Sequence, residues 1–161
     1  MVRNRRYTPI QQLQFLRATY KSYRWSIRPS GFTWWFKTSP TAISDDYLLK
    51  VVYDQGKQPE VFVVHPKPLK MAKGAKKLPH TFNTKSQRLC LYMVKYHEWN
   101  DSMRISETVI HWAIEWLYYY EHWVFTGKWL GGGHGSWDVT PIEILIFHVI
   151  ELTYFEHTSE G

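Results

Sequence analysis

The spacing of apolar side chains changes along the chain from a helical pattern to a strand-like one and back. Over residues 9–23, leucine and aromatic side chains recur every three or four positions behind a proline suited to a first turn, which predicts a helix. Residues 32–37, 47–53 and 61–64 are β-rich runs, and the alternating residues 25–28 can add a fourth strand. Short turns separate these runs, which favours an antiparallel meander because parallel strands need long crossovers.

The second half of the chain contains the strongest helical pattern. Residues 69–88 show no periodicity and many lysines, which indicates a long surface segment with little secondary structure. Residues 106–125 then place large apolar side chains on one broad face, with Ser106 near the N-cap and Gly127 as the expected stop. A Thr-Pro pair predicts a last helix over residues 140–155. This order of elements predicts an α+β fold.

The length and composition of the chain limit the number of domains and indicate the cellular compartment. With 161 residues, the chain fits one domain spanning residues 1–161. Its single cysteine excludes a disulfide framework within the chain and a cysteine-only zinc site. No apolar segment follows the basic N-terminus, and none is long enough to cross a bilayer. We therefore expect a cytoplasmic protein with no membrane partner.

Metal and cofactor sites are not expected from the motifs present. The eight histidines include no His-Glu-x-x-His motif and no pair at metalloprotease spacing. The glycine-rich stretch at residues 131–135 follows a predicted helix and precedes no Lys-Ser/Thr pair, so it does not match a phosphate-binding loop. The sequence therefore predicts no metal and no cofactor.

A basic segment supplies much of the formal net charge of +6. Seven lysine and arginine side chains lie between residues 67 and 88. Such a segment is either a solvated loop or a surface that docks an acidic protein or nucleic acid.

Cys90 follows this basic segment directly. A lone cysteine is usually a small buried apolar side chain. Here, however, a positive field from the preceding residues would favour thiolate over thiol. His80 and His97 lie ten residues before and seven residues after Cys90, so either can be close in space. Since a thiolate attacks carbonyls and thioesters directly, Cys90 is the candidate nucleophile.

The surroundings of Cys90 resemble the active-site region of ubiquitin-conjugating enzymes. In that family a His-Pro-Asn motif lies ten residues before the cysteine, and His80 keeps this interval. The segments that carry the resemblance are Pro79-His80-Thr81-Phe82, Leu89-Cys90-Leu91-Tyr92, Trp99-Asn100 and Ile105-Ser106. A closer resemblance, over roughly residues 79–135, is to the small bacterial relatives encoded in type II short CBASS antiphage operons. The stretches at residues 112–123 and 126–134 are typical of those proteins.

The resemblance implies a fold and a nucleophile, and the sequence departs from the family pattern at one position. The fold would be that of ubiquitin-conjugating enzymes, with an N-terminal helix, an antiparallel meander and C-terminal helices. Cys90 would be the thioester-forming residue. Phe82 stands where the wider family has the asparagine that supports the oxyanion, and losing such a donor typically costs about a hundredfold in rate. Asn83, His80, His97 or His134 could supply that contact instead.

The resemblance also implies a reaction and its partners. Cys90 would form a thioester with the C-terminal glycine of a cGAS-like nucleotidyltransferase and pass it to a lysine of a target protein. This transfer would regulate cyclic-nucleotide antiphage defence. How the carboxyl becomes activated is open, because those operons lack a separate activating enzyme. Two alternatives remain: a non-catalytic scaffold of the same fold that binds the nucleotidyltransferase, and a basic nucleic-acid-binding module using residues 67–88, although no nucleic-acid-binding motif is present.

Overall fold

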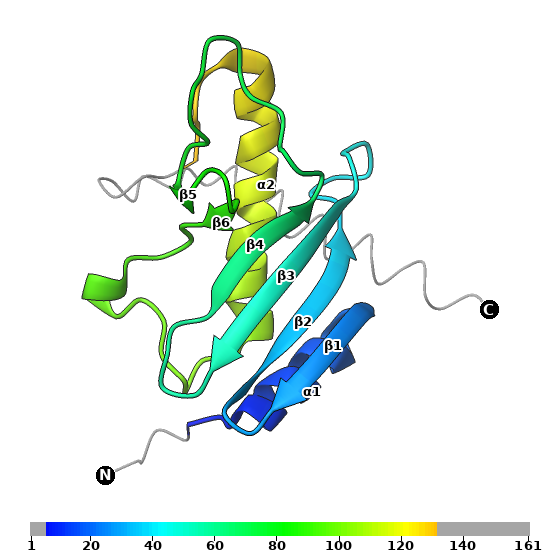
Figure 1. Ribbon diagram of the computed structural model, residues 1–161, viewed down its shortest axis with the longest axis vertical. Coiled ribbons are helices and arrows are strands. Elements are labelled where there is room, and N and C mark those ends of the chain that lie inside the picture. The colour runs from blue at the N-terminus through cyan, green and yellow to red at the C-terminus, as the bar shows by residue number, and fades with distance from the viewer. Residues whose placement is uncertain (1–5, 132–161) are drawn as a thin grey trace, which may run out of the picture. The chain divides into compact units, whose positions relative to one another are not determined.

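The computed structural model describes residues 6–131, which form one helix, a six-stranded sheet and a second long helix (Figure 1). The elements, in chain order, are α1 (Pro9–Thr19), β1 (Ser22–Arg28), β2 (Gly31–Thr38), β3 (Tyr47–Asp54), β4 (Glu60–His65), β5 (Thr81–Asn83), β6 (Arg88–Leu89), the 3₁₀ turns η1 (Val94–Tyr96) and η2 (Ile105–Glu107), and α2 (Val109–Thr126). The α+β class and the N-terminal helix with its antiparallel meander are confirmed.

Helix α1 begins with a reciprocal cap. The backbone N–H of Gln11 donates to the Thr8 hydroxyl at 3.3 Å, and the N–H of Thr8 donates to the Gln11 side chain at 3.0 Å. The helix ends at Thr19, four residues before the predicted end, because Tyr20 is extended and Ser22 already pairs with Phe36 in the sheet.

The sheet has the order β1-β2-β3-β4-β6-β5, and every neighbouring pair is antiparallel. Side chains alternate across it, so that Val61 and Val63 of β4 are buried while Phe62 between them is partly exposed. Both helices contribute side chains to the same buried cluster as β2, β3 and β4. Figure 1 shows α1 and α2 behind the sheet, on the face opposite the viewer.

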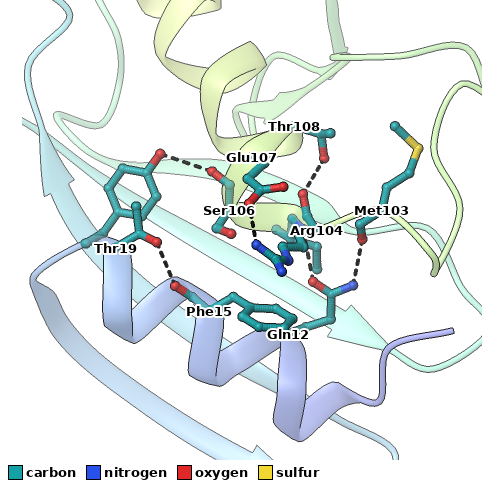
Figure 2. A network of polar contacts seen from close by, with 10 residues as sticks. Gln12, Phe15, Thr19, Met103, Arg104, Ser106, Glu107 and Thr108 are labelled. Atoms are coloured by element: carbon teal, nitrogen blue, oxygen red, sulfur yellow. Dashed lines mark hydrogen bonds and ion pairs between the residues drawn. The ribbon is translucent and has the colours of Figure 1, made fainter. Parts of the chain in front are cut away.

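The segment before α2 is attached to α1 by one buried amide. Gln12 is fully buried; its Nε2 donates to the Met103 carbonyl at 2.8 Å, and its Oε1 accepts from the backbone N–H of Ile105 at 3.0 Å. The Tyr20 hydroxyl adds a bond of 3.1 Å to the Ser106 carbonyl. Figure 2 shows these contacts between α1 and the η2 segment. They fix where α2 starts.

Helix α2 begins three residues after the predicted start at residue 106 and ends one residue after the predicted end at residue 125. Ser106 is buried in η2, two residues before the N-cap position Thr108, so the predicted start of the helix at Ser106 is too early. The reason is that residues 105–107 form a 3₁₀ turn bound to α1. Gly127 ends the helix with a left-handed φ of 72°, as predicted.

The predicted irregular segment is mostly irregular in the structure. It runs beside the C-terminal part of α2, where the Tyr120 hydroxyl donates to the Lys70 carbonyl at 2.9 Å (Figure 1). Residues 81–83 nevertheless form β5, and Arg88 begins β6; such short strands carry too few residues for a visible alternation. The predicted helix over residues 140–155 lies outside the described residues, so the single domain over residues 1–161 stays a prediction.

Candidate active site

Gln87 fixes the turn that leads into β6. Its side chain is buried, its Oε1 accepts from the Leu69 N–H at 2.7 Å, and its Nε2 donates to the Val63 and Pro66 carbonyls at 2.9 and 3.1 Å. The residue has a left-handed φ of 54°. These bonds join the long irregular segment to β4 and thereby set the position of the strand that precedes Cys90.

Cys90 lies directly after β6, and its backbone is bound to His80. The Cys90 N–H donates to the His80 carbonyl at 3.0 Å. The same carbonyl accepts from the indole Nε1–H of Trp116 on α2, also at 3.0 Å. His80 has a φ of 44°, in the left-handed region that histidine tolerates better than β-branched residues. The carbonyl of His80 therefore connects the Cys90 backbone to α2.

The imidazole of His80 packs in an aromatic layer. Its ring stacks on Trp129 with 4.9 Å between centroids and 27° between planes. Trp129 in turn contacts the rings of Trp116 at 5.8 Å and Tyr119 at 6.0 Å. A Cβ added at Gly131 would lie 2.7 Å from Tyr119 Cδ2, so only glycine fits against this layer without displacement. These contacts hold the His80 ring against α2 by packing.

The electrostatics of the thiol differ from the expectation. Burial raises the pKa of Cys90 above its ordinary value of 9.0; Arg88 opposes this shift and Glu98 adds to it. Of the basic residues over positions 67–88, Arg88 lowers this pKa, but burial of the thiol outweighs it. The lowered thiol pKa expected from the charge of the segment is therefore wrong. Its lysines are exposed, and water screens their field.

The structure places the other predicted site residues in different settings. Asn83, in β5, accepts a hydrogen bond from the Ser86 N–H at 2.8 Å with its Oδ1, so this side chain closes the turn before β6. His97 is exposed and has a φ of 52°. His134 lies outside the described residues. Among the predicted site residues, His80 and Cys90 are thus joined by a hydrogen bond between their backbones.

Within residues 6–131, no group of three or more histidine, cysteine or acidic side chains is placed to hold a metal ion. In the same part of the chain, no helix is long and apolar enough to cross a membrane.

One family of known proteins matches most of the chain. The family described as the type II CBASS E2 protein matches residues 12–136. The chain belongs to this family. The match extends from α1 through α2, so it also covers the N-terminal half, which the sequence resemblance over roughly residues 79–135 does not reach. No curated protein matches the chain significantly.

Besides Gln87, two further contributors to the site were not predicted from the sequence. Glu98 acts on the thiol electrostatically, and its Oε2 accepts from the Met93 N–H at 2.5 Å. Trp116 was assigned only to the buried face of its helix, yet its indole binds the His80 carbonyl. Periodicity identifies a buried tryptophan, but it does not reveal which acceptor the indole N–H finds.

Proposed function

We propose that this CBASS E2 protein is an acyl transferase that uses Cys90 as its nucleophile. The observation that carries the proposal is the position of Cys90. Cys90 is partly exposed directly after β6, and its backbone N–H donates to the His80 carbonyl. The chain that carries it belongs to an E2 family. A thiol at such a position can be reached by a partner's chain end while its own backbone stays in place.

The proposed reaction has two steps. In the first, the Cys90 sulfur attacks the glycyl carbonyl of a donor whose C-terminal carboxyl is already activated; the C–S bond forms, the activating group leaves, and the thiol proton is lost to solvent. In the second, the uncharged amine of a lysine attacks the thioester, the C–N bond forms, the C–S bond breaks, and the amine proton passes to the departing thiolate. The products are an isopeptide and regenerated Cys90.

The donor and the acceptor are also proposals. We propose that the donor is the C-terminal glycine of a cGAS-like nucleotidyltransferase and that the acceptor is a lysine of a target protein. Membership of a CBASS family supports this choice. Because a free carboxylate does not form a thioester without an energy source, the donor arrives as an acyl adenylate or as another activated acyl group.

The oxyanion of the second step needs a hydrogen-bond donor. Phe82 occupies the position of the family's asparagine, but its side chain has no hydrogen-bond donor. Its ring instead contacts the Arg88 guanidinium, which lies 4.5 Å from the ring centroid. The Asn83 Oδ1 is bound to Ser86, which leaves the amide NH₂ of Asn83 as a donor. We propose Asn83 or His80 for this role; His97 and His134 stay as predictions.

The test uses the full chain with the nucleotidyltransferase of its own operon, ATP and Mg²⁺. Intact mass and gel mobility then report adducts for the wild type and for Cys90→Ala and Cys90→Ser. We expect a thiol-labile adduct and isopeptide products with the wild type, none with Cys90→Ala, and a thiol-resistant oxyester with Cys90→Ser. Isopeptide formation that persists in Cys90→Ala would overturn the proposal.

One observation favours a non-catalytic scaffold as the second candidate. Burial raises the pKa of Cys90, which keeps the thiol protonated at neutral pH. If the protein is a scaffold, the wild type and Cys90→Ala should co-purify with the nucleotidyltransferase to the same extent. Neither protein should then form an adduct.

A further inference from the structure

A surface cavity lies next to the Cys90 segment on the outer side of the sheet. It is a shallow, open depression with a volume of about 570 Å³. Side chains from β4, β5, β6 and the loops beside them line it, and Cys90 is not among them. We call it the β4–β6 cavity.

The β4–β6 cavity has an excess of positive charge. Three cationic side chains and one carboxylate line it: Lys67, Lys85, Arg88 and Glu60. Arg88 and Glu60 form an ion pair at 2.7 Å and neutralise each other. Lys67 and Lys85 are exposed and take part in none of the ion pairs formed within residues 6–131. Two positive charges are therefore left for an anion, and a phosphate monoester supplies about −1.5 to −2 at neutral pH.

The same cavity has two aromatic rings. Phe82 is 51% exposed, and the Arg88 guanidinium lies 4.5 Å from its ring centroid. Phe62 of β4 also lines the cavity, and the Lys50 ammonium lies 4.3 Å from the centroid of its ring. Nucleobases stack on exposed aromatic rings and on guanidinium planes. A flat heterocyclic ring attached to a phosphate therefore suits this surface better than an aliphatic phosphate.

Asn83 adds a hydrogen-bond donor at the wall of the cavity. Because its Oδ1 accepts from the Ser86 N–H, the assignment of the amide is fixed and its NH₂ group remains to donate. Within the described residues this nitrogen has no partner. An amide donor beside aromatic rings can bind a ring nitrogen or a carbonyl oxygen of a base.

We propose that the β4–β6 cavity binds a nucleoside 5′-monophosphate. The phosphate lies between Lys67 and Lys85, the base packs against Phe82 and Phe62, and the amide of Asn83 donates to the base. Cys90 does not line the cavity, and the site shares only Asn83 with the acyl-transfer proposal, so it exists whether or not Cys90 forms a thioester. A nucleotide within a single-stranded nucleic acid offers the same chemistry, and the experiment distinguishes these two sources.

Isothermal titration of the full chain tests the proposal. The ligands are AMP, GMP, CMP and UMP, with adenosine and inorganic phosphate as the separate halves of AMP and an eight-nucleotide single-stranded RNA as the polymer. We expect at least one monophosphate to bind about tenfold or more tighter than adenosine or phosphate alone. No such preference, or binding of the RNA without binding of any monophosphate, would overturn the proposal.

Variants then locate the site. Lys67→Gln with Lys85→Gln should weaken monophosphate binding about tenfold, and Phe82→Ala should weaken it about 5- to 100-fold through lost stacking. The matched control is Lys73→Gln with Lys76→Gln, which removes the same charge from exposed lysines that do not line the cavity. Equal losses in the two lysine pairs would show non-specific attraction and overturn the site.

A last variant separates this proposal from the acyl-transfer one. Cys90→Ala should abolish adduct formation and leave the affinity for the monophosphate unchanged. Loss of monophosphate binding in this variant would contradict a site separate from the thiol.

Discussion

The backbone N–H of Cys90 donates to the carbonyl oxygen of His80 at 3.0 Å, ten residues earlier in the chain. Through this bond, the conformation of His80 determines where the cysteine lies. This contribution comes from the His80 carbonyl and from its backbone conformation, which has a left-handed φ of 44°. The ten-residue interval between His80 and Cys90 is the one found in ubiquitin-conjugating enzymes. In this structure the two ends of the interval are joined by the backbone hydrogen bond.

Substitutions of His80 separate its backbone role from its imidazole. His80→Asn keeps a residue that tolerates the left-handed region, so adduct formation on Cys90 should fall less than about threefold. His80→Val places a β-branched residue there at a cost of about 1–3 kcal/mol and should reduce adduct formation much further. The measurement is the initial rate of thioester formation. Equal, large losses in both variants would show that the imidazole itself is needed.

Trp116→Phe tests the second bond to the His80 carbonyl. The substitution keeps an aromatic ring beside Tyr120, on which Trp116 stacks at 5.3 Å, and removes the indole donor together with part of the ring. We expect a loss of about 1–2 kcal/mol in the free energy of unfolding, measured in urea. Trp112→Phe on the same helix is the control and should cost clearly less. Equal costs for the two substitutions would show that ring size, and not the hydrogen bond, is what matters.

The pH dependence of Cys90 alkylation follows from the raised pKa. Because burial holds the pKa above 9.0, the thiolate fraction, and with it the rate with iodoacetamide, should still be rising as the pH passes 9. Glu98→Gln removes a charge that raises this pKa and should speed alkylation at pH 8. Arg88→Gln removes a charge that lowers it and should slow alkylation. A rate that levels off below pH 8 in the wild type would contradict this account of the thiol.

Gln12→Leu tests how α1 fixes the segment that leads to α2. The substitution keeps the volume of the side chain but leaves the Met103 carbonyl and the Ile105 N–H buried without their partner. Two such groups should cost about 3 kcal/mol in the free energy of unfolding. Gln14→Leu, on the exposed side of the same helix, should cost less than about 0.5 kcal/mol. A cost as small as that of the control would contradict the role of this amide.

The layout of the fold was predictable because it rests on local periodicity. The predicted strands at residues 32–37, 47–53 and 61–64 lie within β2, β3 and β4, and Gly127 ends α2 as expected. The predictions failed where tertiary contacts determine the local structure. Ser106 forms part of a 3₁₀ turn because that turn is bound to α1, which no local pattern reveals.

The nucleophile of the candidate site could be predicted from the sequence, but most of the residues that contact it could not. Cys90 follows from being the single cysteine at a position that resembles an E2 active site. The contributions of Gln87, Glu98 and Trp116 depend on contacts between residues far apart in the chain. The count of basic residues near Cys90 misled for the same reason, because burial of the thiol outweighs charges that are exposed to water.

The measurement that tests the central claim most directly is peptide-level mass spectrometry of the chain after reaction with the activated nucleotidyltransferase. The account predicts a peptide in which the donor's C-terminal glycine is joined to Cys90, present without reducing agent and lost on treatment with a thiol. Lysine conjugates that accumulate at the wild-type rate in Cys90→Ala, with no modified Cys90 peptide at any time in the wild type, would contradict it.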